Sequence, residues 1–124
     1  MKSLADYEQK FDRLHEDCPV RAALDVIRGR WKPSIFYELK DGPRRFSQLQ
    51  AALAGITAQA LTVQLRQLEA DAVVVRTVHA DESPLRVEYA LSESGKTLSS
   101  VLDQLEVWGA AYMARRGTTR SRVA

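Results

Sequence analysis

The chain has 124 residues, of which 45% are hydrophobic and 27% charged, and a formal net charge of +2 at pH 7. This composition is typical of one globular domain and argues against a disordered or fibrous chain. No apolar run is long enough to span a membrane, and one cysteine cannot form a disulfide within the chain, so we expect a cytoplasmic protein without a membrane partner.

Residue types that bind metals or perform catalysis do not gather in the sequence. His15 and His79 are far apart, and Cys18 is the single cysteine, so no metal-binding spacing exists. The chain also lacks a glycine-rich phosphate loop and a recognisable nucleophile with its base. We therefore expect no metal, no cofactor and no enzymatic activity.

Two helices are predicted before residue 30. Apolar residues in the first 17 positions recur at spacings of three and four, which indicates an amphipathic helix. These residues are Leu4, Tyr7, Phe11 and Leu14. Proline is favoured at the first helical position, so Pro19 places Cys18 at the N-cap of a second helix, which Gly29 ends. The buried stripe of this second helix is predicted to contain Val20, Leu24 and Ile27.

The middle of the chain predicts a helix-turn-helix. A third helix is expected over residues 31–39, and Asp41, Gly42 and Pro43 break the chain after it. Arg44, Arg45 and Phe46 lead into a short helix over residues 47–53. A turn containing Gly55 then joins this helix to another that is capped by Thr57. Two short helices joined by a tight turn are typical of helix-turn-helix proteins.

The two faces of the helix that begins after Thr57 differ in chemistry. Leu61, Leu65, Leu68 and Ala72 fall on one stripe, which predicts the buried side. The opposite side has polar groups and one cation but no carboxylate before Glu69, as suits a helix that contacts bases and phosphates in the major groove. This side carries Gln59, Thr62, Val63, Arg66 and Gln67. The alternative is an ordinary amphipathic helix with a solvated face.

A β-hairpin is predicted directly after this helix. Residues 73–78 are rich in β-branched side chains, and Val87 and Tyr89 favour a second strand over residues 86–91, across a polar link containing proline. A helix-turn-helix followed by a hairpin is the winged-helix arrangement, so we predict an α+β, mainly helical fold. Ser92 caps a long last helix. We expect one domain over residues 1–114 and a basic, disordered tail over residues 115–124.

Several stretches resemble the HxlR family of bacterial transcription regulators, which are relatives of the MarR group. They are residues 18–20, 31–32, 42–46, 55–69, 86–89 and 91–95. The resemblance runs in one register over residues 18–109, and it implies a dimeric winged-helix DNA-binding protein. Some family members sense electrophiles or oxidants through the cysteine at the position of Cys18. Two departures are Arg28-Gly29-Arg30, where the family usually has Gly-Gly-Lys, and Ala72, where it usually has glycine.

Arginines outside the helix that begins after Thr57, which we call the reading helix, are candidates for phosphate contacts. Arg44 and Arg45 precede the first helix of the helix-turn-helix, and simple surface solvation is their alternative. In the hairpin we expect Arg86 to make the main DNA contact and Arg76 the second. Thr57 completes the DNA-binding set on the reading helix. Acidic residues 81–82 at the hairpin tip would repel phosphate, so we expect the tip to stay out of the minor groove.

Cys18 is the candidate redox sensor. A thiol at a helix N-terminus is close to unpaired N–H groups and to the positive end of the helix dipole, which favour the thiolate. Thiolate is the form that reacts with peroxides and quinones. The adjacent carboxylates of Glu16 and Asp17 oppose deprotonation, and a structural role as a helix cap is the alternative. Any disulfide would join two chains or a chain and a small thiol.

The apolar stripes of the first and last helices exceed what one winged-helix core can cover, which predicts a symmetric homodimer. We expect its interface to contain Leu4, Tyr7, Phe11, Leu14, Leu98, Val101, Leu102, Leu105, Trp108 and Tyr112. Alternatively, Trp108 and Tyr112 line a ligand pocket. The predicted function is a repressor that reads a pseudo-palindromic operator in double-stranded DNA and responds to an electrophile or small-molecule inducer. The alternative is a winged helix that binds proteins and not DNA.

Overall fold

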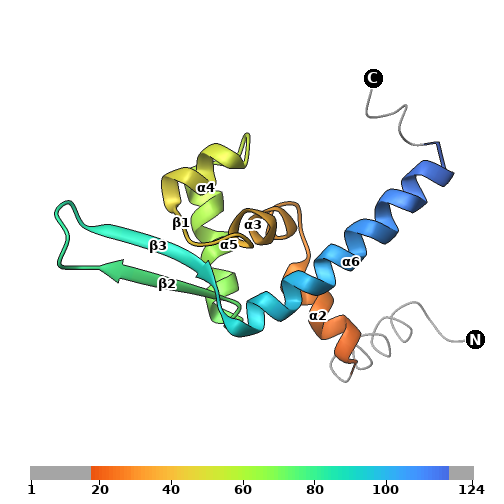
Figure 1. Cartoon of the computed structure of the whole chain (residues 1–124), viewed down its shortest axis with the longest axis horizontal. Coiled ribbons are helices and arrows are strands. Elements are labelled where there is room, and N and C mark those ends of the chain that lie inside the picture. Colours follow the sequence, from red (N-terminus) through yellow and green to blue (C-terminus); the bar gives the residue numbers. More distant parts are fainter. Residues whose placement is uncertain (1–17, 118–124) are drawn as a thin grey trace, which may run out of the picture.

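A computed structural model describes residues 18–117 of the chain (Figure 1). The elements in chain order are α2 (Pro19–Ile27), α3 (Lys32–Leu39), β1 (Arg44–Arg45), α4 (Phe46–Ala52), α5 (Ala58–Ala70), β2 (Val74–His79), β3 (Arg86–Leu91) and α6 (Glu93–Arg115). This is the mainly helical α+β fold with a winged helix that the sequence predicts. The predicted interface residues Leu4, Tyr7, Phe11 and Leu14 lie outside the described residues.

The ends of α2 and α3 follow local sequence signals. Cys18 is the N-cap of α2 with Pro19 at the first position, as predicted, and Gly29 adopts a φ of 108° after the helix ends. The prediction of a buried stripe on α2 is correct for Ile27 alone. Val20 is 65% exposed and Leu24 is 43% exposed, because no described element covers that side of the helix.

The helix-turn-helix consists of α4 and α5. Thr57 caps α5, since its Oγ1 accepts a hydrogen bond from the backbone N–H of Ala60 at 3.0 Å. Leu61, Leu65 and Leu68 are buried, as predicted. These leucines hold the helix on the core, so its opposite side faces outward.

Ala72 does not belong to the buried stripe of α5, which corrects that prediction. The helix ends at Ala70, and Ala72 is exposed with a φ of 61°. The backbone N–H of Ala72 donates to the carbonyl of Glu69 and that of Val73 to the carbonyl of Leu68, at 2.9 and 3.1 Å. This pattern is a Schellman motif, whose left-handed position usually holds glycine.

Three antiparallel strands form the sheet, in the order β1-β3-β2. The predicted hairpin is confirmed, with β3 at the expected residues and β2 one residue later than expected. The strand β1 was not predicted. Residues 44–45 pair with β3 instead of leading in as a loop, and α4 therefore begins at Phe46.

The start of the last helix lies beside the end of α5. Ser92 Oγ donates to the carbonyl of Ala72 at 2.7 Å and accepts from the N–H of Gly95 at 3.0 Å, which makes it the predicted N-cap of α6. Leu98 and Leu102 pack against the core of their own chain. The C-terminal half of α6 projects away from the other described elements (Figure 1).

Candidate nucleic-acid interface

The outward side of α5 is the centre of the candidate interface. Gln59, Val63, Arg66 and Gln67 are all exposed there, opposite the buried leucines. The described residues carry no acidic side chain on this row, because Glu69 lies to one side and lines the groove between α5 and the sheet. The row therefore offers amide groups, one methyl surface and one guanidinium.

Two predicted contact residues on α5 already use their hydroxyl groups within the helix. Thr57 accepts the capping hydrogen bond described above, and Thr62 Oγ1 donates to the carbonyl of Ala58 at 2.8 Å. Thr62 is half-buried and faces the sheet. Both threonines thus have a structural role, and Thr62 presents mainly its methyl group to the neighbouring groove.

A row of side chains crosses the sheet beside α5. The strand register places Tyr89 opposite Arg44 on one side and opposite Arg76 on the other. Side chains at one register level share a face of the sheet, so two arginines flank one aromatic ring. Sequence reasoning missed Tyr89, because only the pairing of β1 with β3 brings it between the arginines.

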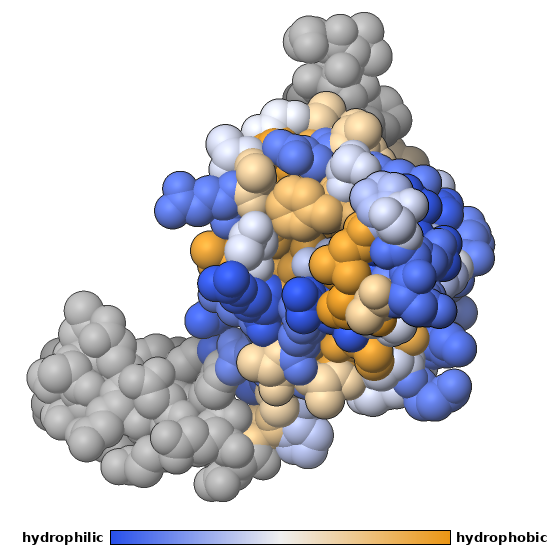
Figure 2. Space-filling view, turned by 90° about the vertical axis from the view of Figure 1, so that its left-hand side faces the viewer, coloured by the Kyte–Doolittle hydropathy of each residue, from blue (hydrophilic) through white to orange (hydrophobic). Residues whose placement is uncertain are grey.

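A cavity of about 500 Å³ separates this row from α5, and Arg66 and Arg76 both line it. Phe46, Val87 and Tyr89 supply its apolar part. Figure 2 shows the hairpin side of the molecule, where hydrophobic surface in the middle is bordered by hydrophilic side chains. The cations of helix and sheet therefore line a shared recess whose wall is part polar and part apolar.

The predicted contact residue Arg86 lies on the other face of the hairpin among carboxylates. Its guanidinium is 2.6 Å from Glu82 and 3.6 Å from Glu88, and its buried Nε has no hydrogen-bond partner among the residues that the structure describes. His79 joins the same cluster through Nε2, which is 2.9 Å from the Glu88 carboxylate. Arg45 shares this face by register, since it pairs with Glu88.

The comparison with protein families identifies the group to which this arrangement belongs. The model of the HxlR-like helix-turn-helix family matches residues 26–117, which include the helix-turn-helix, the hairpin and all of α6. The chain belongs to the HxlR-like helix-turn-helix family. It is accordingly a transcriptional regulator and not an enzyme.

Known relatives match this HxlR-like regulator over most of its length. The HTH-type transcriptional regulator YybR of Bacillus subtilis (strain 168) is 46% identical over 94 residues, which are 76% of this chain and 74% of YybR. The redox regulator HypR in its reduced form is 42% identical, with a TM-score of 0.73 and coverage of 83% and 98%. Reduced YodB from B. subtilis is 33% identical, with a TM-score of 0.67 and coverage of 73% and 89%.

The cysteine of the HxlR-like chain lies where the sequence predicts. Cys18 caps α2 and is half-buried, and its side chain makes no capping hydrogen bond. The thiol is therefore not required to close the first turn of the helix. No described helix of the regulator is both long and apolar enough to cross a membrane.

The outer half of α6 carries an uncovered apolar stripe. Its members Val101, Leu105, Trp108 and Tyr112 are between 37% and 62% exposed. The rings of Trp108 and Tyr112 stack with centroids 5.2 Å apart. These two aromatic residues belong neither to the core nor to the lining of the cavity between α3 and α6.

Proposed function

We propose that this regulator binds a pseudo-palindromic operator as a homodimer and represses transcription. The observation that carries the proposal is the outward row of α5, which is free of carboxylates and presents Gln59, Val63 and Arg66. A glutamine can read adenine, a valine can meet a thymine methyl group, and an arginine can pair with guanine or phosphate. Gln67 lies on the same row, Thr62 flanks it, and Thr57 caps the start of the helix.

We assign the contacts to DNA phosphates to arginines outside the outward row of α5. Arg44 and Arg76 extend the positive surface from α5 onto the sheet, and Arg45 is assigned to a phosphate contact from the opposite face of the sheet. We place Arg86 last among the contacts, because two carboxylates already surround its guanidinium. Contacts to phosphate would set affinity and orientation, whereas α5 would set sequence.

The dimer is proposed on the uncovered side of α6. Isolated apolar side chains are normal on a protein surface, but a continuous stripe marks an interface. Val101, Leu105, Trp108 and Tyr112 would meet their counterparts about a two-fold axis, and residues of the first predicted helix would join them. Two copies of α5 would then enter successive major grooves about 34 Å apart.

Cys18 is proposed as the sensor. Two relatives support this role: HypR is described as a redox regulator, and structures exist of its oxidised form and of diamide-treated YodB. The single cysteine of this chain would respond to an oxidant or electrophile by forming a disulfide between two chains or with a small thiol. Movement of α2 would then alter the spacing of the reading helices.

The test is selection of bound fragments from genomic DNA, followed by measurement of affinity against salt concentration. We expect one short inverted repeat and an affinity that falls steeply with salt. Diamide should release the DNA, and Cys18→Ser should abolish that release while keeping the affinity of the reduced protein. Fragments bound without sequence preference would contradict the operator proposal. Equal release from the Cys18→Ser variant would remove Cys18 as the sensor.

A further inference from the structure

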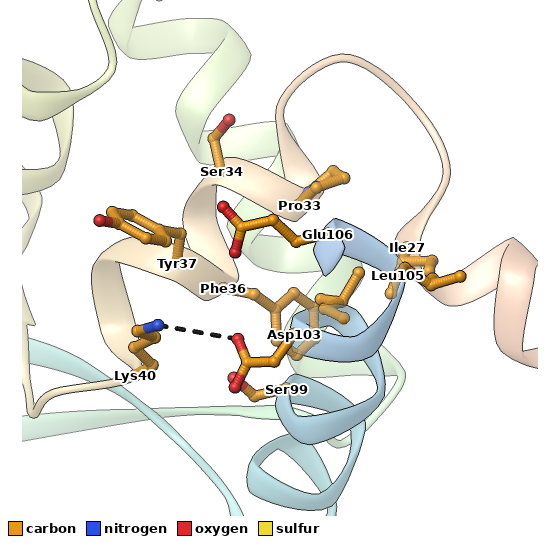
Figure 3. A pocket seen from close by; sticks show the side chains of 11 residues that line it. Ile27, Pro33, Ser34, Phe36, Tyr37, Lys40, Ser99, Asp103, Leu105 and Glu106 are labelled. Carbon is orange, nitrogen blue, oxygen red and sulfur yellow. Dashed lines mark ion pairs between the residues drawn. The ribbon is translucent and has the colours of Figure 1, made fainter. Parts of the chain in front are cut away.

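A second cavity of about 500 Å³ lies between α3 and α6, away from the candidate DNA interface (Figure 3). We call it the α3–α6 cavity. Its volume falls within the range of about 300–1,000 Å³ that small-molecule sites occupy. Ile27, Phe36 and Leu102 make most of its wall apolar, and Phe36 and Ile27 belong to the buried core. An apolar wall of this size is costly to leave in water.

The rim of the α3–α6 cavity carries excess negative charge. Lys40 of α3 lies 3.7 Å from Asp103 of α6, and its ammonium also lies 4.9 Å from the centroid of the Tyr37 ring. Glu106 reaches from α6 toward α3 and has no ion pair with any described residue (Figure 3). Among the residues that the structure describes, two carboxylates therefore face one ammonium, and the carboxylate without an ion pair is that of Glu106.

The cavity and the proposed dimer stripe share Leu105 but otherwise lie on different sides of α6. At about 100° per residue, Leu102 and Glu106 point roughly a quarter turn or more away from Val101 and Trp108. A second copy seated on the stripe would leave the rim carboxylates open to small molecules.

We propose that the α3–α6 cavity binds lipophilic cations. The apolar body of such a ligand would rest on Phe36 and Leu102, and its charge would lie beside Glu106. An anion would meet two carboxylates, and a neutral molecule would gain no ionic contact with the exposed carboxylate of Glu106. This proposal adds a class of ligand to the proposed function. Only the effect of the ligand on operator binding rests on that proposed function.

Tetraphenylphosphonium and tetraphenylborate are suitable probes, because they have the same shape and opposite charge. Titration calorimetry on the full chain without DNA should show tighter binding of the cation by about tenfold. Glu106→Gln should reduce this preference by about threefold to fivefold, as expected for one partly solvated charge. Glu106→Lys should reverse it. Glu93→Gln removes an exposed carboxylate from the same helix outside the cavity and should leave the preference unchanged.

The outcomes separate clearly. Equal affinity for the two ions, no binding of either up to millimolar concentration, or an unchanged preference in Glu106→Gln would each overturn the proposal. With operator DNA present, tetraphenylphosphonium should weaken DNA binding by the wild type and have less effect on Glu106→Gln. Binding of the cation without this effect would overturn its regulatory role. A chain that binds the cation but no DNA would overturn the proposed function and leave the cavity assignment standing.

Discussion

Arg86 of β3 donates from Nη2 to the carboxylate of Glu82 across 2.6 Å, so the wing supplies a counter-charge to its own arginine. Arg76 on β2 makes no such ion pair with the residues that the structure describes. We predict that Arg76→Ala lowers DNA affinity and reduces the slope of affinity against salt by about one unit, as for one lost phosphate contact. Arg86→Ala should change the slope less. Fluorescence anisotropy at several salt concentrations measures both, and equal slope changes would contradict the prediction.

Two glutamines of α5 lie on different sides of the helix. Gln59 lies on the outward row, whereas Gln64 lines a recess beside residues 28–30 and 32. We predict that Gln59→Ala weakens operator binding by about 1–3 kcal/mol and relaxes the preference at one base pair, because a bidentate base contact is lost. Gln64→Ala should leave affinity nearly unchanged. Competition binding with operator variants that differ at single base pairs measures both the affinity and the base preference.

Ala72 has a left-handed backbone conformation. At a φ of 61° its Cβ is strained, and glycine has no such strain. We predict that Ala72→Gly raises the free energy of unfolding by about 1 kcal/mol. Ala70→Gly, two residues earlier within α5, should lower it by up to about 1 kcal/mol. Urea denaturation of the two variants should thus give opposite signs, and a loss of stability in Ala72→Gly would refute the assignment of strain.

The substitution of alanine for glycine at Gly95 and at Gly109 compares a tightly packed position of α6 with an open one. A Cβ at Gly95 would overlap the carbonyl oxygen of Val73, which is backbone and cannot move away cheaply. We predict that Gly95→Ala costs about 2–3 kcal/mol of stability. A Cβ at Gly109 would meet nothing within 4 Å, so Gly109→Ala should stabilise the helix by about 0.5–1 kcal/mol. Thermal and urea unfolding check both values.

The apolar stripe of α6 gives a prediction for assembly. Trp108 is 62% exposed, and Ala110 lies on the opposite side of the helix. We predict that Trp108→Glu converts the homodimer into a monomer, because it would bury two like charges against each other at the two-fold axis. Ala110→Glu adds the same charge away from the stripe and should remain dimeric. Sedimentation equilibrium distinguishes the two, and a monomeric wild type would contradict the dimer itself.

The parts of this fold that depend on neighbouring residues could be predicted from the sequence. Thr57 and Ser92 are helix caps because their hydroxyls accept from the N–H three residues on, and neither needs a distant partner. Pro19 likewise fixed the start of α2. The alternation of Val87, Tyr89 and Leu91 with Arg86 and Glu88 placed β3 at the predicted bounds.

Structural features that depend on residues far apart in the sequence could not be predicted from it. The two residues of β1 form a strand only because β3 lies beside them, and Tyr89 joins the candidate interface for the same reason. The ion pair of Arg86 depends on how the hairpin tip folds back. The exposure of Val20 and Leu24 depends on which elements cover α2, and no periodicity contains that information.

The junction between Ala72 and Ser92 couples the two helices on which the proposed function depends. Ser92 donates to the carbonyl of Ala72 from its side chain and to that of Val73 from its backbone N–H, at 2.7 and 3.0 Å. The start of α6 is thereby fixed to the end of α5, with no flexible connection between them. In the proposed dimer, the crossing angle of the two α6 helices would set the distance between the two α5 helices. The number of base pairs between operator half-sites would then be a property of the α6 crossing, so a change in that crossing would favour operators of a different spacing.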